Sequence, residues 1–157
     1  MGTTEDLFTG IAARLGAASI GRYITDADAD AGATWQAGDT AITRGKLPSE
    51  PDRAIAWRVM PAAADVHSPF GTFLAAAICR GLPDDPADAS NLADAIRANL
   101  LGLTDVIFGA THVIQVRFGG AIDLDEDESN RTMWSTKLLL DVDEAPTILR
   151  PEGGAWD

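Results

Sequence analysis

Apolar side chains recur at helical spacing near the start of the chain. The stripe runs along one helix face and consists of Leu7, Phe8, Ile11, Ala12 and Leu15. Because these positions fall three and four residues apart, they predict a helix from about Thr4 to Ala18. The hydroxyl of Thr3 or Thr4 is suited to cap its first turn. Glu5 and Asp6 favour the positive end of the helix dipole.

A second set of positions at helical spacing follows the turn-forming stretch from Gly81 to Pro86. The set consists of Leu92, Ala95, Ile96, Asn99, Leu100 and Leu103. This spacing predicts a helix from about Ala87 to Leu101. Gly102 is suited to close the helix, because glycine adopts the left-handed conformation that follows many helix ends without steric cost.

Apolar runs predict strands on both sides of the second helix. The expected strands are Thr40 to Arg44, Ala54 to Met60, Phe70 to Arg80, a short piece from Val106 to Phe108, Thr111 to Phe118 and Arg131 to Val142. In the strand that begins at Thr111, strict alternation places His112, Ile114 and Val116 on one face. The order of elements indicates an α+β fold, with a mostly antiparallel sheet packed by two main helices in a single domain.

Polar and turn-forming residues separate the expected elements. The stretch from Asp26 to Asp39 is rich in Asp, Ala and Gly and predicts a loop, which Trp35 is expected to pin to the body. Pro61 is expected to end its strand, because proline cannot donate to a sheet ladder. A second loop is expected from Ala62 to Pro69, and a charged hairpin loop from Asp123 to Asn130.

The end of the chain differs in composition from the rest. After Asp143 two prolines and the pair Gly153-Gly154 predict a flexible arm. We therefore divide the chain into a domain of residues 1–143 and a C-terminal arm of residues 144–157. Docking of Trp156 on a neighbouring subunit is an alternative to a loose end.

The bulk composition restricts the classes of function. Twenty-four Asp and Glu against 12 Lys and Arg give a formal net charge of −12 over 157 residues. Such a chain is not expected to hold a nucleic-acid backbone by counterion release. No apolar run approaches the roughly 20 residues that span a bilayer, so no membrane partner is expected. The acidic start lacks the pattern of a secretion signal, which favours synthesis in a cytoplasm.

The candidate nucleophiles and bases lack the context that catalysis requires. No serine lies in a nucleophile-elbow motif, and the two histidines, His67 and His112, fall in a loop and near a strand start. Cys79, the only cysteine, lies in an alanine-rich strand and is expected to be a small buried hydrophobe. Gly119-Gly120 leads into an acidic segment and not into a helix, which argues against a phosphate site. We expect no catalytic residue and no cofactor; a hydrolase with an unrecognised site is an alternative.

Two acidic loops have the alternate carboxylates that begin a calcium-binding loop. They contain Asp26, Asp28 and Asp30 in one case and Asp123, Asp125 and Asp127 in the other. The twelfth position, where a bidentate glutamate completes the calcium shell, holds Ala37 in the first loop and Trp134 in the second. We therefore expect solvated loops and no metal site, with loose cation binding as the alternative.

Several segments in a fixed order carry a resemblance to a known family. They are the opening helix from Leu7 to Leu15, the turn Gly45-Lys46-Leu47-Pro48 with Pro51-Asp52-Arg53-Ala54, the segment Arg80-Gly81-Leu82-Pro83, the helix from Asn91 to Ile96 with Leu100 to Leu103, the strand from His112 to Val116, and the acidic loop from Asp125 to Asn130 with Arg131 and a strand closing at Asp141-Val142. In this order and spacing the chain resembles the tail-terminator family of long-tailed bacteriophages, whose members are also described as minor capsid or tail-to-head joining proteins.

The resemblance implies a structural virion protein of the tail and neck, assembled in the host cytoplasm. It implies a ring, usually a hexamer, that caps the head-proximal end of the tail tube, ends tube polymerisation and provides the joint to the head connector. The implied partners are further copies of the chain, the major tail tube protein and the head-tail connector protein, while DNA passes through the lumen without specific binding. The alternatives are a head-completion or connector ring protein of the phage neck and a small acidic non-catalytic binding module.

Two surfaces are candidates for contacts in such a ring. The first flanks the turn from Gly45 to Pro51 and consists of Arg44, Lys46, Leu47 and Arg53. Its cations are expected to pair with carboxylates of a neighbouring subunit. The second is the acidic tip of the late hairpin and consists of Asp123, Asp125, Glu126, Asp127 and Glu128. Because a charged tip cannot be buried in a core, we expect it to line the bore or a tube-facing rim, with a merely solvated loop as the alternative.

Overall fold

Seven strands form one sheet in this computed structural model, which describes residues 2–64 and 70–143. The strands are β1 (Arg22–Tyr23), β2 (Ala41–Arg44), β3 (Ala54–Ala64), β4 (Phe70–Pro83), β5 (Thr104–Phe108), β6 (Thr111–Leu124) and β7 (Arg131–Asp143). Their order across the sheet is β1-β2-β3-β4-β7-β6-β5. The pairs β1–β2 and β2–β3 are parallel and all other neighbours are antiparallel, so the sheet is mixed but mostly antiparallel.

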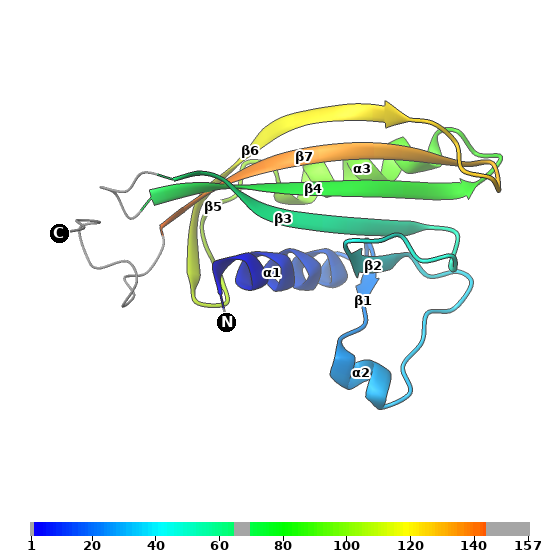
Figure 1. Cartoon of the computed structure of the whole chain (residues 1–157), viewed down its shortest axis with the longest axis horizontal. Helices are drawn as coiled ribbons and strands as arrows, with labels where there is room; N and C mark the ends of the chain where they lie inside the picture. Colours follow the sequence, from blue (N-terminus) through cyan, green and yellow to red (C-terminus); the bar gives the residue numbers. More distant parts are fainter. Residues whose placement is uncertain (1, 65–69, 144–157) are drawn as a thin grey trace.

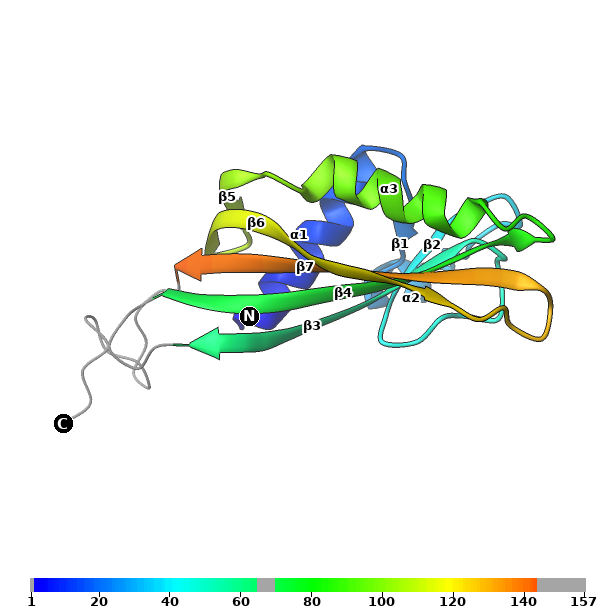
Figure 2. The same cartoon turned by 90° about the horizontal axis from the view of Figure 1, so that it is seen from above.

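Both main helices lie on the same face of the sheet (Figure 1, Figure 2). α1 (Thr3–Ala17) packs on β1, β3 and β5, and α3 (Asp88–Leu100) packs on β4 and β7. The predicted α+β fold, with a mostly antiparallel sheet and two main helices, is therefore confirmed. None of the helices in residues 2–64 and 70–143 combines the length and the hydropathy needed to cross a bilayer.

The apolar stripe of α1 faces the sheet as predicted. All five of its side chains are buried: Leu7, Phe8, Ile11, Ala12 and Leu15. The predicted threonine cap is wrong, because Gly2 precedes the first turn and makes no side-chain cap. Asp6 instead fastens the helix to the β5–β6 turn, where its Oδ2 accepts hydrogen bonds from the backbone N–H of Ala110 and the hydroxyl of Thr111.

α3 buries Leu92, Ile96 and Leu100 against the sheet. Its start lies very close to the end of β4, since a Cβ atom on Gly81 would lie 2.7 Å from the backbone nitrogen of Ala89. Gly81 thus permits an approach that any larger residue would prevent.

α3 ends at Leu100, and its C-cap residue Leu101 is extended. Gly102 follows with a left-handed φ of +83°, and its N–H donates to the carbonyl oxygen of Val116 and not to the helix, so the predicted closure by glycine is not seen.

Side chains on the central strands alternate between the helix-covered face and the opposite face. On β4, the buried set is Phe73, Ala75, Ala77 and Cys79, while the intervening side chains are half-buried on the opposite face. Trp57 and Ile55 of β3 are fully buried beneath the helices. Each fully buried large aliphatic side chain contributes roughly 1.5–3 kcal/mol to folding, so this face supplies most of the apolar stabilisation.

The prediction that Pro61 ends its strand is wrong. β3 continues through Pro61 to Ala64, and its pairing register with β4 shifts between Pro61 and Ala63. β2 pairs only with residues 54–57 of β3, so Pro61 has β4 as its one strand neighbour. A proline is tolerated in an edge position because no second strand needs its missing N–H.

The predicted alternation along the strand from Thr111 is also wrong beyond Ile114. The register of β6 against β7 shifts between Val113 and Gln115, and again between Phe118 and Gly120. Val113 before the first shift and Val116 after it are both buried, which strict alternation would forbid. β6 also extends to Leu124, beyond the predicted end at Phe118.

The predicted loop from Asp26 to Asp39 contains a short helix, α2 (Asp26–Asp30), and follows the short strand β1. We call residues 24–39 the projection, because this segment stands out from the body of the molecule (Figure 1). The indole Nε1 of Trp35 donates to the carbonyl oxygen of Arg22 at 2.9 Å. Trp35 therefore pins the segment to β1, as predicted.

Candidate assembly surfaces

The predicted basic turn is divided by the fold. Arg44 pairs with Glu5, and its guanidinium carbon lies 5.3 Å from the centroid of the Phe8 ring. Arg53 donates through Nε and Nη2 to the two carboxylate oxygens of Asp88, at 3.0 and 2.8 Å. Both arginines are thus paired within the chain.

Lys46 and Leu47 differ from the two arginines of this turn. Lys46 is exposed and has no carboxylate partner within residues 2–64 and 70–143, and Leu47 is half-buried. The structure therefore leaves only Lys46 and Leu47 of the four predicted residues available for a new partner without first breaking an existing pair.

Of the five carboxylates predicted for the hairpin tip, Asp123 lies within β6, opposite Trp134, and the other four lie in the loop, where Asp127 has a structural role. Asp127 accepts hydrogen bonds from the backbone N–H of Ser129 and from the backbone N–H and Nε of Arg131. Desolvation raises the pKa of Asp127, but the hydrogen bonds from Arg131 and Ser129 outweigh it and lower the pKa overall. The exposed members are Asp123, Asp125, Glu126 and Glu128.

Two buried arginines clamp the β2–β3 turn to the end of the sheet, and sequence reasoning did not assign this role to them. Arg80 donates through Nε and Nη2 to the carbonyl oxygens of Asp52 and Pro51, both at 2.7 Å. Arg131 donates through Nη1 to the carbonyl oxygen of Ser49 at 3.0 Å and to Asp52 Oδ1 at 3.2 Å. Arg80 lies near the end of β4 and Arg131 begins β7, and this position next to a turn is the one feature of the sequence that hints at their role.

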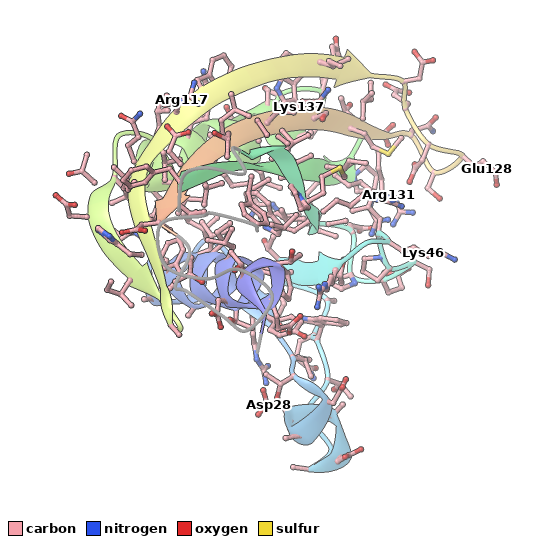
Figure 3. The ribbon with its side chains drawn as sticks, turned by 60° about the vertical axis from the view of Figure 1, so that its left-hand side comes forward. Asp28, Lys46, Arg117, Glu128, Arg131 and Lys137 are labelled. Atoms are coloured by element: carbon pink, nitrogen blue, oxygen red, sulfur yellow. The ribbon has the colours of Figure 1, made fainter. Side chains whose placement is uncertain are left out.

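The basic turn and the acidic tip lie at the same end of the molecule, as the positions of Lys46, Arg131 and Glu128 show (Figure 3). A backbone hydrogen bond from Asp84 to the carbonyl oxygen of Asn130 joins the β4–α3 turn to the hairpin loop. We call residues 45–53, 84–87 and 125–130 together the loop end. The two predicted surfaces are therefore adjacent parts of one charged surface.

The second large surface is the face of the sheet opposite the helices, which we call the uncovered face. Cross-strand pairing arranges its residues in rows. The central row consists of Arg58, Ala76, Lys137 and Gly120. The flanking rows consist of Met60, Leu74, Leu139 and Arg117 on one side and of Ala56, Ile78, Ser135 and Ile122 on the other. The face is thus largely apolar, with cations near its centre.

An ion pair closes one end of this face. Arg117 donates through Nε and Nη2 to Asp141 at 2.7 and 2.9 Å, and Asp141 also accepts from Gln115 and from the hydroxyl of Thr72. The hydrogen bonds from Arg117 are the largest cause that holds the pKa of Asp141 well below its ordinary value. Arg58 and Lys137 have no such partner in residues 2–64 and 70–143.

The described residues hold no catalytic constellation. Burial raises the pKa of the Cys79 thiol to about 12, so Cys79 is the inert buried hydrophobe that was predicted. His112 lies 3.1 Å from Asp105 through Nε2 in an exposed position, and His67 lies outside the described residues. No group of three or more His, Cys, Asp or Glu side chains in residues 2–64 and 70–143 is arranged to hold a metal ion.

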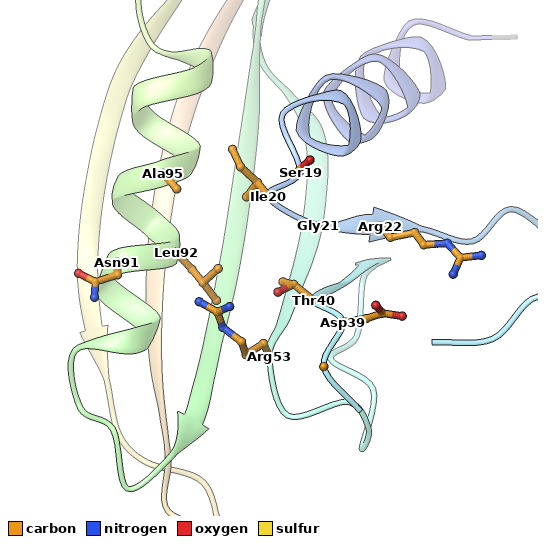
Figure 4. Close-up of a pocket in the computed structure, with 11 residues that line it drawn as sticks. Ser19, Ile20, Gly21, Arg22, Asp39, Thr40, Arg53, Asn91, Leu92 and Ala95 are labelled. Carbon is orange, nitrogen blue, oxygen red and sulfur yellow. The ribbon is translucent and has the colours of Figure 1, made fainter. Parts of the chain in front are cut away.

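The cavities do not suggest a reaction site. One of about 470 Å³ lies between the end of α1, the start of β3 and α3, and Arg53, Asn91 and Thr40 are among its lining residues (Figure 4). The guanidinium of Arg53 is already bound by Asp88. A second cavity, of about 500 Å³, lies between the projection and Pro51 and is lined mainly by apolar atoms. Neither lining brings together an acid, a base and a nucleophile.

Comparison with known proteins gives a family and a fold neighbour. Residues 14–144 match the family model described as bacteriophage tail terminator protein. Among solved structures, the chain is similar to a chain of the virion of a native gene transfer agent particle, with a TM-score of 0.52 and 13% sequence identity over 64% of this chain and 77% of that chain. At this identity the likeness concerns the fold alone. No curated protein sequence matches.

Proposed function

Because the chain belongs to the bacteriophage tail terminator family, we propose that it forms a closed ring on the head-proximal end of the tail tube and stops the tube from growing. As a member of this structural, non-catalytic family, the chain is a component of the virion tail, and the expectation that it is not an enzyme is confirmed. The match over residues 14–144 is the single observation that carries the proposal.

A ring requires two different surfaces on each subunit, because neighbours around a cyclic axis meet head to tail. The projection and the uncovered face are two such surfaces. They lie on different parts of the chain and differ in charge, since the projection carries Asp26, Asp28 and Asp30 and the uncovered face presents Arg58 and Lys137. This asymmetry supports a head-to-tail arrangement.

The acidic tip has a role in the proposed ring. Its exposed carboxylates, including Glu126 and Glu128, line the bore or the rim that meets the tube. Because adhesion of DNA increases with the number of phosphates that a protein neutralises, an acidic lining allows DNA to pass without binding. On the basic turn, Lys46 and Leu47 contact the neighbouring subunit, while Arg44 and Arg53 hold the turn in shape through their pairs with Glu5 and Asp88.

The partners of the proposed ring are the major tail tube protein on one side and the head-tail connector protein on the other. One face of the ring must fit the end of the tube, and the opposite face must fail to accept a further tube subunit. Ring copy number six is part of this proposal, as is the joint to the connector.

The proposal is tested by adding the purified chain to tails from a phage that lacks its terminator. We expect a cap at the head-proximal end in electron micrographs, a uniform tube length in assembly reactions, and restored joining to heads. A variant with Lys46→Glu and Leu47→Asp should form fewer caps, while the matched exposed-site variant Arg14→Glu should cap normally. A chain that binds isolated heads and ignores tubes would instead be a neck connector protein.

A further inference from the structure

We propose that the uncovered face binds the projection of a second copy of this chain, with Asp26 and Asp30 of one subunit seated on Arg58 and Lys137 of the next. The proposal deepens the ring proposed above and rests on it, because it takes a neighbouring subunit as the occupant of the face. In this contact the projection of each subunit meets the uncovered face of the next.

The uncovered face has the composition of a docking surface. Its central row carries Arg58 and Lys137 on either side of Ala76, so the two cations lie two strand spacings apart, roughly 10 Å between backbones. Apolar side chains border this row, and Met60 and Ile122 are 43% and 49% exposed. The small side chain of Ala76 lies between the two cations, so one incoming segment can contact both of them.

The same face has unused positive charge on a chain whose net charge is −12. Arg117 is neutralised by Asp141, but neither Arg58 nor Lys137 contacts a carboxylate in residues 2–64 and 70–143. Two identical acidic chains repel one another unless a local positive surface meets a local negative one. The face supplies the positive partner in such a contact.

The projection supplies the negative partner. No Lys or Arg occurs between Tyr23 and Thr43, and the segment carries Asp26, Asp28, Asp30 and Asp39. α2 has no buried residue, and it depends on its capping box, in which Thr25 and Asp28 exchange hydrogen bonds of 3.1 Å. A five-residue helix held by local contacts alone gains nothing from the core of its own subunit.

Unlike the side chain of Asp28, those of Asp26 and Asp30 make no hydrogen bond or ion pair within residues 2–64 and 70–143. They stand four residues apart in α2, so they lie on one side of the helix and repel each other. Asp28 is on the other side and is engaged by Thr25. Two cations spaced across strands, with long flexible side chains, can pair with both Asp26 and Asp30 and convert this repulsion into attraction.

The geometry of the chain allows the contact to propagate. The projection extends from the β1 edge of the sheet, away from the strands that carry Lys137 and Arg117 (Figure 3). One subunit can therefore offer its projection to one neighbour and its uncovered face to the other. A contact between two unlike surfaces closes into a ring when the rotation between subunits permits.

Charge exchange tests the proposal in the full-length chain, both alone at low salt and on tail tubes. The face variant carries Arg58→Glu and Lys137→Glu, and the projection variant carries Asp26→Lys and Asp30→Lys. We expect each to lower self-association at least tenfold in sedimentation experiments, and a chain with all four changes to recover to within about threefold of the wild type. The matched control Asp85→Lys and Asp94→Lys, which makes the same change in net charge as the projection variant at two exposed positions outside both surfaces, should associate as the wild type does. Circular dichroism of each variant verifies folding.

If a charge-exchange variant folds poorly, disulfide formation between two variants with one introduced cysteine each tests the same contact. Asp30→Cys in one chain and Lys137→Cys in another should form a disulfide-linked pair on mixing under mild oxidation, while Glu128→Cys with Lys137→Cys should not. The proposal is overturned if the Asp30→Cys and Lys137→Cys chains form no such link either alone or on tubes, if the four-fold exchange fails to recover, or if the projection variant associates normally while only the face variant loses association.

The outcomes separate this inference from the ring function. If the projection and face variants still cap tubes and associate as the wild type does, the inference fails and the capping function stands. If charge exchange restores association and no variant or wild type caps tubes, the inference stands and the capping function fails.

Discussion

Arg80 and Arg58 lie on the same face of the sheet, on the neighbouring strands β4 and β3, yet their surroundings are opposite. Arg80 is only 3% exposed, and the turn at Pro51 and Asp52 covers it and accepts its hydrogen bonds. Arg58 is exposed and has no carboxylate partner in residues 2–64 and 70–143. The same type of side chain thus serves the fold where a turn crosses the sheet and remains exposed where none does.

The largest expected effect is that of Arg80→Met, which keeps the apolar stem and removes the donors. Two buried carbonyl oxygens, of Pro51 and Asp52, would lose their partners, so we expect the free energy of unfolding to fall by about 2–3 kcal/mol. Urea denaturation followed by circular dichroism measures the change. A loss below about 0.5 kcal/mol would mean that water or another group replaces these hydrogen bonds.

Arg53→Met should have an intermediate effect. The side chain of Arg53 is 35% exposed, and its partner Asp88 is 10% exposed and keeps one hydrogen bond from the backbone N–H of Leu82. We expect a loss of about 1–2 kcal/mol, because a charge-assisted pair is broken while Asp88 remains partly satisfied. The same denaturation experiment measures it, and Asp88→Ala should cost more than Arg53→Met.

The ion pair between Arg117 and Asp141 should make the free energy of unfolding depend on pH in acid. Hydrogen bonds from Arg117 lower the folded-state pKa of Asp141 below its ordinary value of 3.8. The resulting stability is present above that ordinary pKa and is lost as the pH falls through the folded value. Between about pH 4 and pH 2, Asp141→Asn and Arg117→Met should therefore both show a shallower decline in free energy of unfolding than the wild type. An unchanged slope would contradict the pairing.

The smallest expected effect on stability is that of Arg58→Met, the counterpart of Arg80→Met. An exposed cation without a partner in the described chain adds little to folding, so the change should stay within about 0.5 kcal/mol. Urea denaturation of Arg58→Met and Arg80→Met under the same conditions measures the difference in their free energies of unfolding. A loss from Arg58→Met equal to that from Arg80→Met would remove the distinction between them.

The parts of the fold that depend on local pattern could be predicted from the sequence. The five apolar positions of α1 and the extent of α3 follow from helical spacing. The burial of Cys79 likewise follows from its alternating apolar strand. In each case the structure depends on residues that are close together in the sequence.

Several features could not be predicted because distant residues decide them. β1 has only two residues and exists because β2 lies beside it. Pro61 fits within β3 only because β2 ends before reaching it, and the shifts in β6 depend on its pairing with β7. For the candidate surfaces, no local signal distinguished Arg53, which finds Asp88, from Lys46, which finds no carboxylate in the described chain.

The amino-acid sequence alone determined the two main helices, the alternating central strands, the acidic character of the chain and its likeness to tail terminators, because periodicity, charge and the order of segments are properties of the chain itself. Only the tertiary structure decided which charges are consumed by the fold. Asp127, Arg80 and Arg131 are held at the loop end, while Arg58 and Lys137 are not, because pairing depends on which turns cross which strands, and that is a matter of distances between residues far apart in the sequence.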